Sequence, residues 1–227
     1  MLLHLRNILT PQELDDARAL LGPGAAWGDG RSSAGGQAVE RKNNQQLAQD
    51  DPAAARLRAL VLAALRRDPV FFSAALPRKI FNPMFNRHAG GQNHYGQHVD
   101  GAVLHSRDPD QWVRTDLSCT LFLTPPETYD GGELVLHEPQ GQQRFKLPAG
   151  DLLLYPGTLL HEVSPVTRGE RIASFFWVES MVRGEEQRRL LFDMDMALLK
   201  LRGRGDDDAV VRLTGTYHNL LRMWADT

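Results

Sequence analysis

Short apolar runs separated by glycine, proline, asparagine and aspartate fill the sequence between residues 80 and 178, with no helical pattern between them. The runs cover residues 80–85, 117–123, 133–137, 143–147, 151–155, 161–166 and 171–178. Many short strands joined by turns are typical of a β-sandwich or barrel. Asp130-Gly131-Gly132 and Arg168-Gly169 have the composition of hairpin turns. This part of the chain therefore predicts a β-rich core.

Two helices are predicted before this core. Thr10 can cap a helix over residues 10–21, with Pro11 at its first position and Glu13 three residues after the cap. Residues 51–67 repeat leucine and valine at helical spacing, which predicts a helix packed on a sheet.

Between these helices, residues 28–46 are polar and rich in glycine. We interpret them as a long loop with some strand, either a solvated connector or a lid, because long loops in compact domains are often functional. After residue 181 the pattern is helical again, interrupted by the acidic patch 206–208, and a last helix is expected near 217–224. The leucines of this region fit either packing on the β-core or the contact face of a homo-oligomer.

The predicted fold class is α+β, a double-stranded β-helix (jelly roll) with helices at both ends of the chain. Three parts are expected. Residues 1–79 supply helices and a loop that pack on the core, residues 80–180 form the jelly roll, and residues 181–227 form a C-terminal helical region.

Composition excludes several classes of protein. The 227 residues carry a net charge of −2, so no basic excess favours nucleic acid as a partner. No apolar run is long enough for a membrane span, and the first residues lack a signal-peptide pattern, so a cytoplasmic location is expected. The single cysteine, Cys119, excludes an intrachain disulfide framework. A metal site would therefore need histidine and carboxylate ligands.

Three candidate metal ligands stand out. His98 and Asp100 are two residues apart, and on a strand such residues point to the same face. His161 lies on another predicted strand, which a jelly roll can bring alongside the first. Two histidines and one carboxylate form the facial triad that holds non-haem Fe(II) in oxygenases. This set predicts an iron site with three coordination positions left for cosubstrate and dioxygen.

Arg171 strengthens this interpretation. It begins the predicted strand that returns beside the strand of His161, after the turn Arg168-Gly169. A 2-oxoglutarate bound to the iron would point its second carboxylate toward this strand, where a guanidinium can bind it with two hydrogen bonds. The alternative is a surface ion pair of Arg171 with Glu170 or Glu179.

These motifs resemble the prolyl 4-hydroxylase-type branch of the Fe(II)/2-oxoglutarate dioxygenases, and over nearly the whole chain the bacterial PKHD-type hydroxylases associated with iron uptake. The matching segments are Tyr-x-x-His-x-Asp at residues 95–100, then 130–134, 148–151, 155–156, 161, 165–166, 169 and 171, with 42–46, 85–87, 114–118 and 217–221 outside the catalytic core. The resemblance implies Fe(II) at His98, Asp100 and His161, and 2-oxoglutarate at Arg171, with L-ascorbate keeping the iron reduced. Collagen-type relatives favour an aromatic residue near position 88, where this chain has His88.

Other residues near these motifs have weaker signals. By resemblance, Tyr95 contacts 2-oxoglutarate, although on a regular strand it would face away from His98 and would need a bulge or twist to reach the site. His94 and His105 are expected at the pocket mouth or in solvent. Trp112 and Arg114 follow a predicted polar loop over residues 101–111 and are candidates for substrate contact.

The predicted function is that of a 2-oxoglutarate-dependent dioxygenase that hydroxylates a small molecule or peptide with dioxygen. Candidate substrates are a prolyl or lysyl residue, a free amino acid, a peptide or a siderophore-like molecule, with a link to iron uptake or homeostasis. Asp100 favours hydroxylation over halogenation, because related halogenases lack this carboxylate. Two alternatives stay open: a non-catalytic Fe(II)/2-oxoglutarate sensor acting through a partner, and a cupin-like metal protein.

Overall fold

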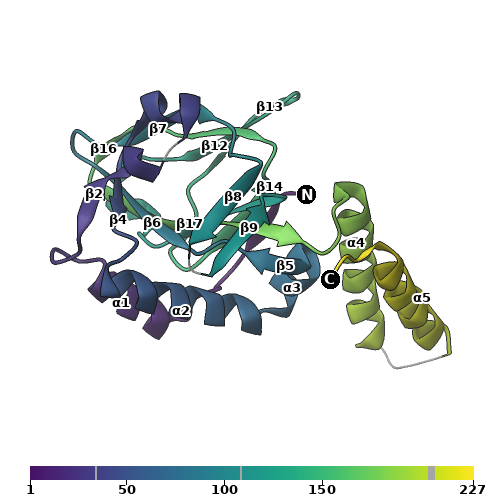
Figure 1. Cartoon of the computed structure of the whole chain (residues 1–227). Coiled ribbons are helices and arrows are strands. Elements are labelled where there is room, and N and C mark those ends of the chain that lie inside the picture. Colours follow the sequence, from purple (N-terminus) through teal and green to yellow (C-terminus); the bar gives the residue numbers. More distant parts are fainter. Residues whose placement is uncertain (34, 108, 204–207) are drawn as a thin grey trace.

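Two main β-sheets and five α-helices make up the mixed α/β fold of the computed structural model (Figure 1). The structure describes residues 1–33, 35–107, 109–203 and 208–227, and the numbers of sheets, strands and helices refer to those ranges. The expected acidic patch at 206–208 lies outside them except for Asp208, which begins the last helix.

The larger sheet has eight strands. They are β1 (Leu3–Leu5), β14 (Leu152–Pro156), β10 (Leu117–Phe122), β17 (Glu170–Ser180), β6 (Met84–Ala89), β4 (Gln45–Leu47) and β2 (Trp27–Asp29) in this order, with β5 (Pro77–Ile80) paired to β17. The smaller sheet has the order β13 (Gly141–Phe145), β12 (Leu134–Glu138), β15 (Leu160–Val163), β7 (His94–His98) and β3 (Lys42–Asn43). Two further pairs stand apart from these sheets: β8 (Val103–Arg107) with β9 (Asp110–Arg114), which follow each other in the chain, and β11 (Asp130–Gly131) with β16 (Val166–Arg168), which do not.

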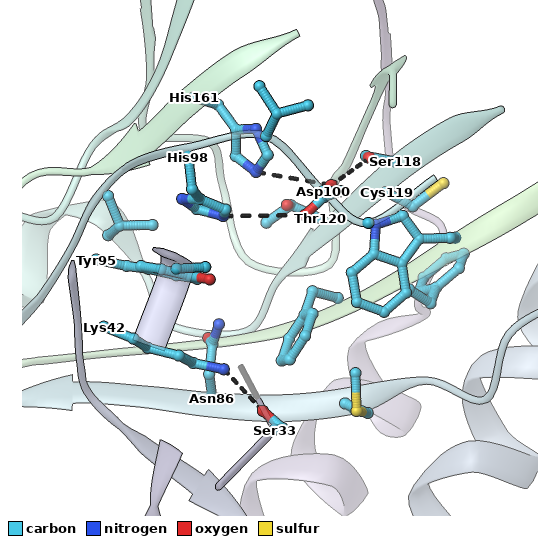
Figure 2. A pocket seen from close by; sticks show the side chains of 18 of the residues that line it. Ser33, Lys42, Asn86, Tyr95, His98, Asp100, Ser118, Cys119, Thr120 and His161 are labelled. Carbon is cyan, nitrogen blue, oxygen red and sulfur yellow. Dashed lines mark hydrogen bonds and ion pairs between the residues drawn. The ribbon is translucent and has the colours of Figure 1, made fainter. Parts of the chain in front are cut away.

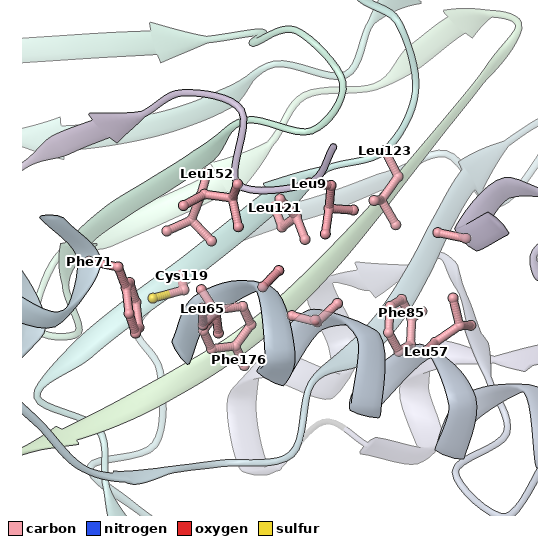
Figure 3. Close-up of a cluster of buried hydrophobic side chains, with 14 of the residues drawn as sticks. Leu9, Leu57, Leu65, Phe71, Phe85, Cys119, Leu121, Leu123, Leu152 and Phe176 are labelled. Carbon is pink, nitrogen blue, oxygen red and sulfur yellow. The ribbon is translucent and has the colours of Figure 1, made fainter. Parts of the chain in front are cut away.

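Alternation along β10 divides the interior into two layers. Leu117, Cys119 and Leu121 belong to one buried cluster with residues of the N-terminal helices (Figure 3). Phe122 belongs to a second cluster, together with Leu134 from the smaller sheet. Because successive side chains of a strand point to opposite faces, one face of the larger sheet packs on helices and the other faces the smaller sheet.

Helices α1 (Pro11–Leu20) and α2 (Pro52–Arg67) lie along the outer face of the larger sheet (Figure 1). The predicted cap is present, since Thr10 accepts from the backbone N–H of Glu13 and the Glu13 side chain accepts from that of Thr10. Asp51 caps α2. The sequence therefore predicted both helices correctly, and it missed the short α3 (Pro69–Ala75) that follows them.

The polar segment 28–46 is more ordered than a loop. It contains the ends of β2 and β4, two 3-10 turns (Gly30–Ser33 and Gly36–Arg41) and β3, which pairs with β7. Strands this short and polar lack the alternation that a sequence pattern needs. The segment connects the edges of both sheets and forms part of the cavity described below.

Several predicted strand boundaries are wrong. The run 80–85 is divided between β5 and β6 around Asn82-Pro83, because proline cannot donate to a sheet ladder. The run 161–166 is divided between β15 and β16. The predicted loop 101–111 is mostly strand, since it overlaps β8 and β9.

Helices α4 (Glu185–Arg202) and α5 (Asp208–Trp224) lie together at one side of the sheets (Figure 1). The last helix begins at Asp208, nine residues earlier than the expected start at 217. Leu191, Leu198 and Tyr217 pack with Leu76 at the end of α3, which connects this helix pair to the rest of the chain. None of the helices in the described ranges is long and apolar enough to cross a membrane.

Candidate active site

The three predicted metal ligands converge in the structure. Strands β7 and β15 pair antiparallel with His98 directly opposite His161, and Asp100 follows two residues after His98. The Asp100 carboxylate lies between the rings, with Oδ1 3.8 Å from His98 Nε2 and Oδ2 3.8 Å from His161 Nε2. One ligand atom from each residue lies within 4.8 Å of the others (Figure 2). Such a cluster can surround one ion.

Both imidazoles are oriented for metal binding by the backbone. His98 Nδ1 donates to the Gly96 carbonyl at 2.8 Å, and His161 Nδ1 donates to the Leu159 carbonyl at 2.9 Å. These bonds fix the tautomer in which Nε2 carries the lone pair that faces the cluster. Burial and the nearby His161 ring lower the pKa of His98, so its ring is neutral at neutral pH. The donor set therefore fits a divalent ion.

Asp100 is positioned by a strand of the facing sheet. Ser118 on β10 donates from Oγ to Asp100 Oδ2 at 2.7 Å. This contact comes from the opposite sheet, so the two sheets together determine where the carboxylate lies. Sequence reasoning missed Ser118, because its pairing with Asp100 depends on the distance between the sheets rather than on a motif.

Arg171 lies on β17 and is 1% exposed, one of the largest fully buried side chains among the described residues. Its Nε and Nη1 have no hydrogen-bond partner among the described residues. The alternative of a surface ion pair fails, because Glu170 binds Arg87 at 2.9 Å and Glu179 binds Arg78 at 3.6 Å. A buried guanidinium without a carboxylate is costly unless an anionic ligand binds there.

Tyr95 lies on the same side as His98 because β7 has a bulge. The two-residue step of β15 from His161 to Val163 matches a three-residue step of β7 from His98 to Tyr95. The extra residue rotates Tyr95 onto the face of His98. The two rings stack with centroids 3.6 Å apart and an angle of 12° between them. The bulge that Tyr95 needs in order to reach the site is therefore present.

A cavity of about 710 Å³ opens beside this cluster. Its lining includes the triad, Arg171 and Tyr95, together with the aromatic side chains of Phe175 and Trp177 on β17. This volume is in the range of small-molecule sites. The cavity is therefore large enough for 2-oxoglutarate and part of a second molecule.

The weaker candidates have different surroundings. His105 lines the cavity and binds Asp110 at 2.7 Å, whereas His94 binds the neighbouring Asn93 side chain at 3.1 Å and is not among the lining residues. Trp112 and Arg114 are also absent from the described lining. Arg114 forms two hydrogen bonds with Asp116, so its geometry is that of a structural ion pair.

Position 88 departs from the aromatic residue expected by resemblance. His88 is fully buried and lies opposite Arg171 in the pairing of β6 with β17. Asn44 Nδ2 lies 3.1 Å from His88 Nε2. Burial, followed by the charge of Arg171, lowers the pKa of His88 well below its usual value. This position therefore holds a neutral ring, as an aromatic residue would.

Family models match two parts of the chain. Residues 83–179 match the 2OG-Fe(II) oxygenase superfamily, and residues 185–226 match the PKHD-type hydroxylase C-terminal domain. Fe(II) and 2-oxoglutarate are the metal and cosubstrate of this superfamily, and the donor set of the site fits both.

Solved structures with the same fold include a prolyl hydroxylase from Trichoplax adhaerens in complex with a hypoxia inducible factor peptide fragment (TM-score 0.54, 17% identity, covering 84% of this chain and 86% of that one). A non-heme alpha-ketoglutarate-dependent carbocyclase of nogalamycin biosynthesis matches with a TM-score of 0.55, at 16% identity over 80% of each chain.

Sequence relatives are much closer. PKHD-type hydroxylases of Polaromonas sp. and Verminephrobacter eiseniae are 59% and 58% identical to this chain over 228 aligned residues, which cover 100% of both partners. Identity at this level over full length shows common family membership. The chain belongs to the PKHD-type hydroxylase family of the 2OG-Fe(II) oxygenases.

Proposed function

We propose that the chain hydroxylates a small-molecule or peptide substrate with Fe(II) held by His98, Asp100 and His161 and 2-oxoglutarate held by Arg171. The observation that carries this proposal is the combination of Arg171, a buried guanidinium without a protein carboxylate, with three converging metal ligands in one cavity. Each part is uncommon alone, and together they match the two components that this oxygenase family uses.

The residues of the chain bind the metal and the cosubstrate, orient them and exclude water from the site. When bound, iron and 2-oxoglutarate supply the activation of dioxygen, with succinate and carbon dioxide as the products of the cosubstrate. Arg171 would bind the cosubstrate carboxylate far from the metal with charge-assisted hydrogen bonds. Tyr95 packs on His98 and fixes the plane of that ligand. Phe175 and Trp177 keep this part of the cavity apolar.

The substrate class is part of the proposal. Candidates are a prolyl or lysyl residue, a peptide or a siderophore-like molecule, in a pathway of iron uptake or homeostasis, with ascorbate as the reductant. The related prolyl hydroxylase with a bound peptide fragment shows that this fold can accept a peptide, although the identity of 17% carries only the fold. Dioxygen is the second substrate.

The domain organisation, location and assembly of the chain are also part of this proposal. The two facing sheets and their antiparallel order support the jelly roll expected for residues 80–180, with 1–79 and 181–227 as flanking parts. We propose that the enzyme is cytoplasmic and that its C-terminal helix pair forms the contact face of a homo-oligomer.

Succinate formation tests the proposed function. The full chain with Fe(II), 2-oxoglutarate and ascorbate should form succinate in air, and His98→Ala or Asp100→Ala should abolish it because the metal site loses a ligand. His218→Ala removes an exposed imidazole on α5 and is the matched control. Binding of 2-oxoglutarate without any succinate from the native chain would favour the sensor alternative, and full turnover in either ligand variant would contradict the assignment of the triad.

A further inference from the structure

A second buried cation lies in the cavity, on a different element from Arg171. Lys42 belongs to β3, where its backbone pairs with Tyr95, and the whole residue is only 5% exposed. It lines the cavity together with the triad (Figure 2). Lysine is rarely buried without a charged partner. Its position therefore needs an explanation.

The surroundings of the Lys42 ammonium contain neutral acceptors and aromatic rings. Its Nζ donates to Ser33 Oγ at 2.8 Å and to Gln46 Oε1 at 3.3 Å. The same Nζ lies 5.3 Å from the centre of the Tyr95 ring and 5.6 Å from that of Phe175. Within the ranges that the structure describes, no carboxylate forms an ion pair with Lys42. The positive charge is thus held in place by neutral groups rather than by a directly paired carboxylate.

Asn86 adds a side-chain amide at the same place. It lies directly opposite Gln46 in the pairing of β4 with β6, so the two side chains share a face. Asn86 is 8% exposed and lines the cavity, so the Nδ2 group of its side-chain amide is available to donate to an anion there. In Figure 2 its amide lies beside the end of the Lys42 side chain. An ammonium and an amide therefore face the same space.

Charge balance indicates what that space accepts. The charges of Fe(II) and Arg171 are matched by Asp100 and the two carboxylates of 2-oxoglutarate. The charge of Lys42 is left over in a partly apolar cavity, where an unbalanced charge is costly. A second anion would remove this imbalance, and neither the metal nor the cosubstrate provides one.

We propose that Lys42, with Asn86 beside it, binds a carboxylate of the hydroxylated substrate and so selects acidic substrates. This inference rests on the proposed function and specifies its substrate class. Lys42 acts as a binding residue in this role, because it contacts the substrate rather than the reacting atoms.

The protonation of Lys42 is compatible with this role. Burial lowers its pKa to about 8, and the charges of Asp100 and Asp29 act in the opposite direction. The ammonium is therefore mostly charged at neutral pH and can respond measurably to a bound anion.

A direct test measures the pKa of Lys42 in the full chain. The sequence has only four lysines, at 42, 79, 146 and 200, so labelled lysine gives a short NMR spectrum, and Lys79→Arg, Lys146→Arg and Lys200→Arg assign Lys42 by elimination. The sample contains Zn(II) in place of iron, which avoids paramagnetic broadening, and saturating 2-oxoglutarate, which occupies Arg171. The probes are acetate and its neutral counterpart acetamide, at equal ionic strength.

We expect acetate to raise the Lys42 pKa by about one unit or more, since an adjacent opposite charge favours the ammonium. Acetamide should leave it unchanged. Asn86→Asp places a carboxylate at the same position, so it should raise this pKa without acetate and abolish the acetate response. Equal effects of acetate and acetamide would overturn the proposal. So would a rise caused by 2-oxoglutarate alone, because Lys42 would then belong to the cosubstrate site.

A blocked tripeptide, acetyl-Gly-Asp-Gly-amide, identifies the source of the carboxylate. A response to acetate alone indicates a small acid, and a response to the tripeptide indicates an acidic peptide. Because these measurements use Zn(II) and do not depend on turnover, their failure alongside normal succinate formation rejects only the role of Lys42. Absence of succinate from the native chain rejects the proposed function itself.

Discussion

Arg171, a fully buried guanidinium, illustrates how a single residue limits what the site can do. The central carbon of its guanidinium lies 5.3 Å from the centre of the Phe122 ring. Two of its nitrogen atoms have no hydrogen-bond partner in the described structure. Burial lowers its pKa, although an arginine still stays protonated. Such a residue is stabilised by an anion that arrives from outside the chain.

Arg171→Ala should therefore weaken 2-oxoglutarate binding by about 1.5–3 kcal/mol, roughly 10- to 150-fold in Kd, the range for hydrogen bonds to a charged group. Calorimetry of the metal-loaded chain measures the Kd for 2-oxoglutarate in the native chain and in the variant. Arg168 lies three residues before Arg171, and its exposed guanidinium binds Asp130. Arg168→Ala should leave the affinity for 2-oxoglutarate unchanged and serves as the control. Unchanged affinity in Arg171→Ala would exclude Arg171 from the cosubstrate site.

Residues differ in how well the sequence predicts them. The spacing of His98, Asp100, His161 and Arg171 in the sequence already implies a common face and adjacent strands, and all four line one cavity in the structure. Lys42 stands out in the sequence only as part of a family motif, since nothing local to residues 28–46 indicates that a polar lysine is buried. Its burial depends on the pairing of β3 with β7, which joins residues more than 50 positions apart.

At the scale of elements, the start of α1 combines a cap with a tertiary contact. Glu13 accepts from the Thr10 backbone and binds Arg67 at the end of α2, with Oε1 2.6 Å from Nη1. The Arg67 guanidinium is the main reason that the pKa of Glu13 is lowered from 4.5 to about 2. This carboxylate thus connects the two helices that cover the larger sheet.

Glu13→Gln should reduce the free energy of unfolding by about 0.5–1 kcal/mol at pH 7, the range for a helix cap and an exposed ion pair. Because the folded-state pKa lies below the unfolded one, the contribution is complete above pH 4.5 and disappears as the pH falls toward 2. Urea unfolding from pH 7 to pH 2.5 measures the difference, with the exposed Glu127→Gln as control. A difference as large at pH 2.5 as at pH 7 would refute this assignment.

Elements were predictable where local rules dominate. The cap at Thr10 and the apolar run of β10 are local, and the sequence indicates both correctly. The bulge in β7 that turns Tyr95 toward His98 was not predictable, because it arises from the register with β15. Likewise β8 and β9 are polar, and their pairing shows in no hydrophobic pattern.

At the scale of the whole molecule, the C-terminal helix pair has its own small core. Leu198 of α4 is 1% exposed and packs with Leu76, Leu191 and Tyr217, whereas its neighbour Leu199 is 59% exposed. This core is separate from the cluster between the larger sheet and α2. We therefore expect the helix pair to open without disrupting the sheets.

Leu198→Ala should destabilise the helix pair by about 2–5 kcal/mol, as a buried leucine truncation does, and Leu199→Ala should have an effect within about 0.5 kcal/mol. Hydrogen exchange of the two variants measures it. Amides of α4 and α5 should lose protection in Leu198→Ala while those of α2 keep theirs. Equal loss of protection in α2 would show that the chain unfolds as one cooperative unit.

A crystal structure of the full chain, grown without oxygen in the presence of Fe(II) and 2-oxoglutarate, tests the proposed metal and cosubstrate site directly. We expect one metal ion bound by His98 Nε2, the Asp100 carboxylate and His161 Nε2, with the distal carboxylate of 2-oxoglutarate on Arg171. A metal ion bound elsewhere, or a cosubstrate carboxylate that does not contact Arg171, would contradict this expectation.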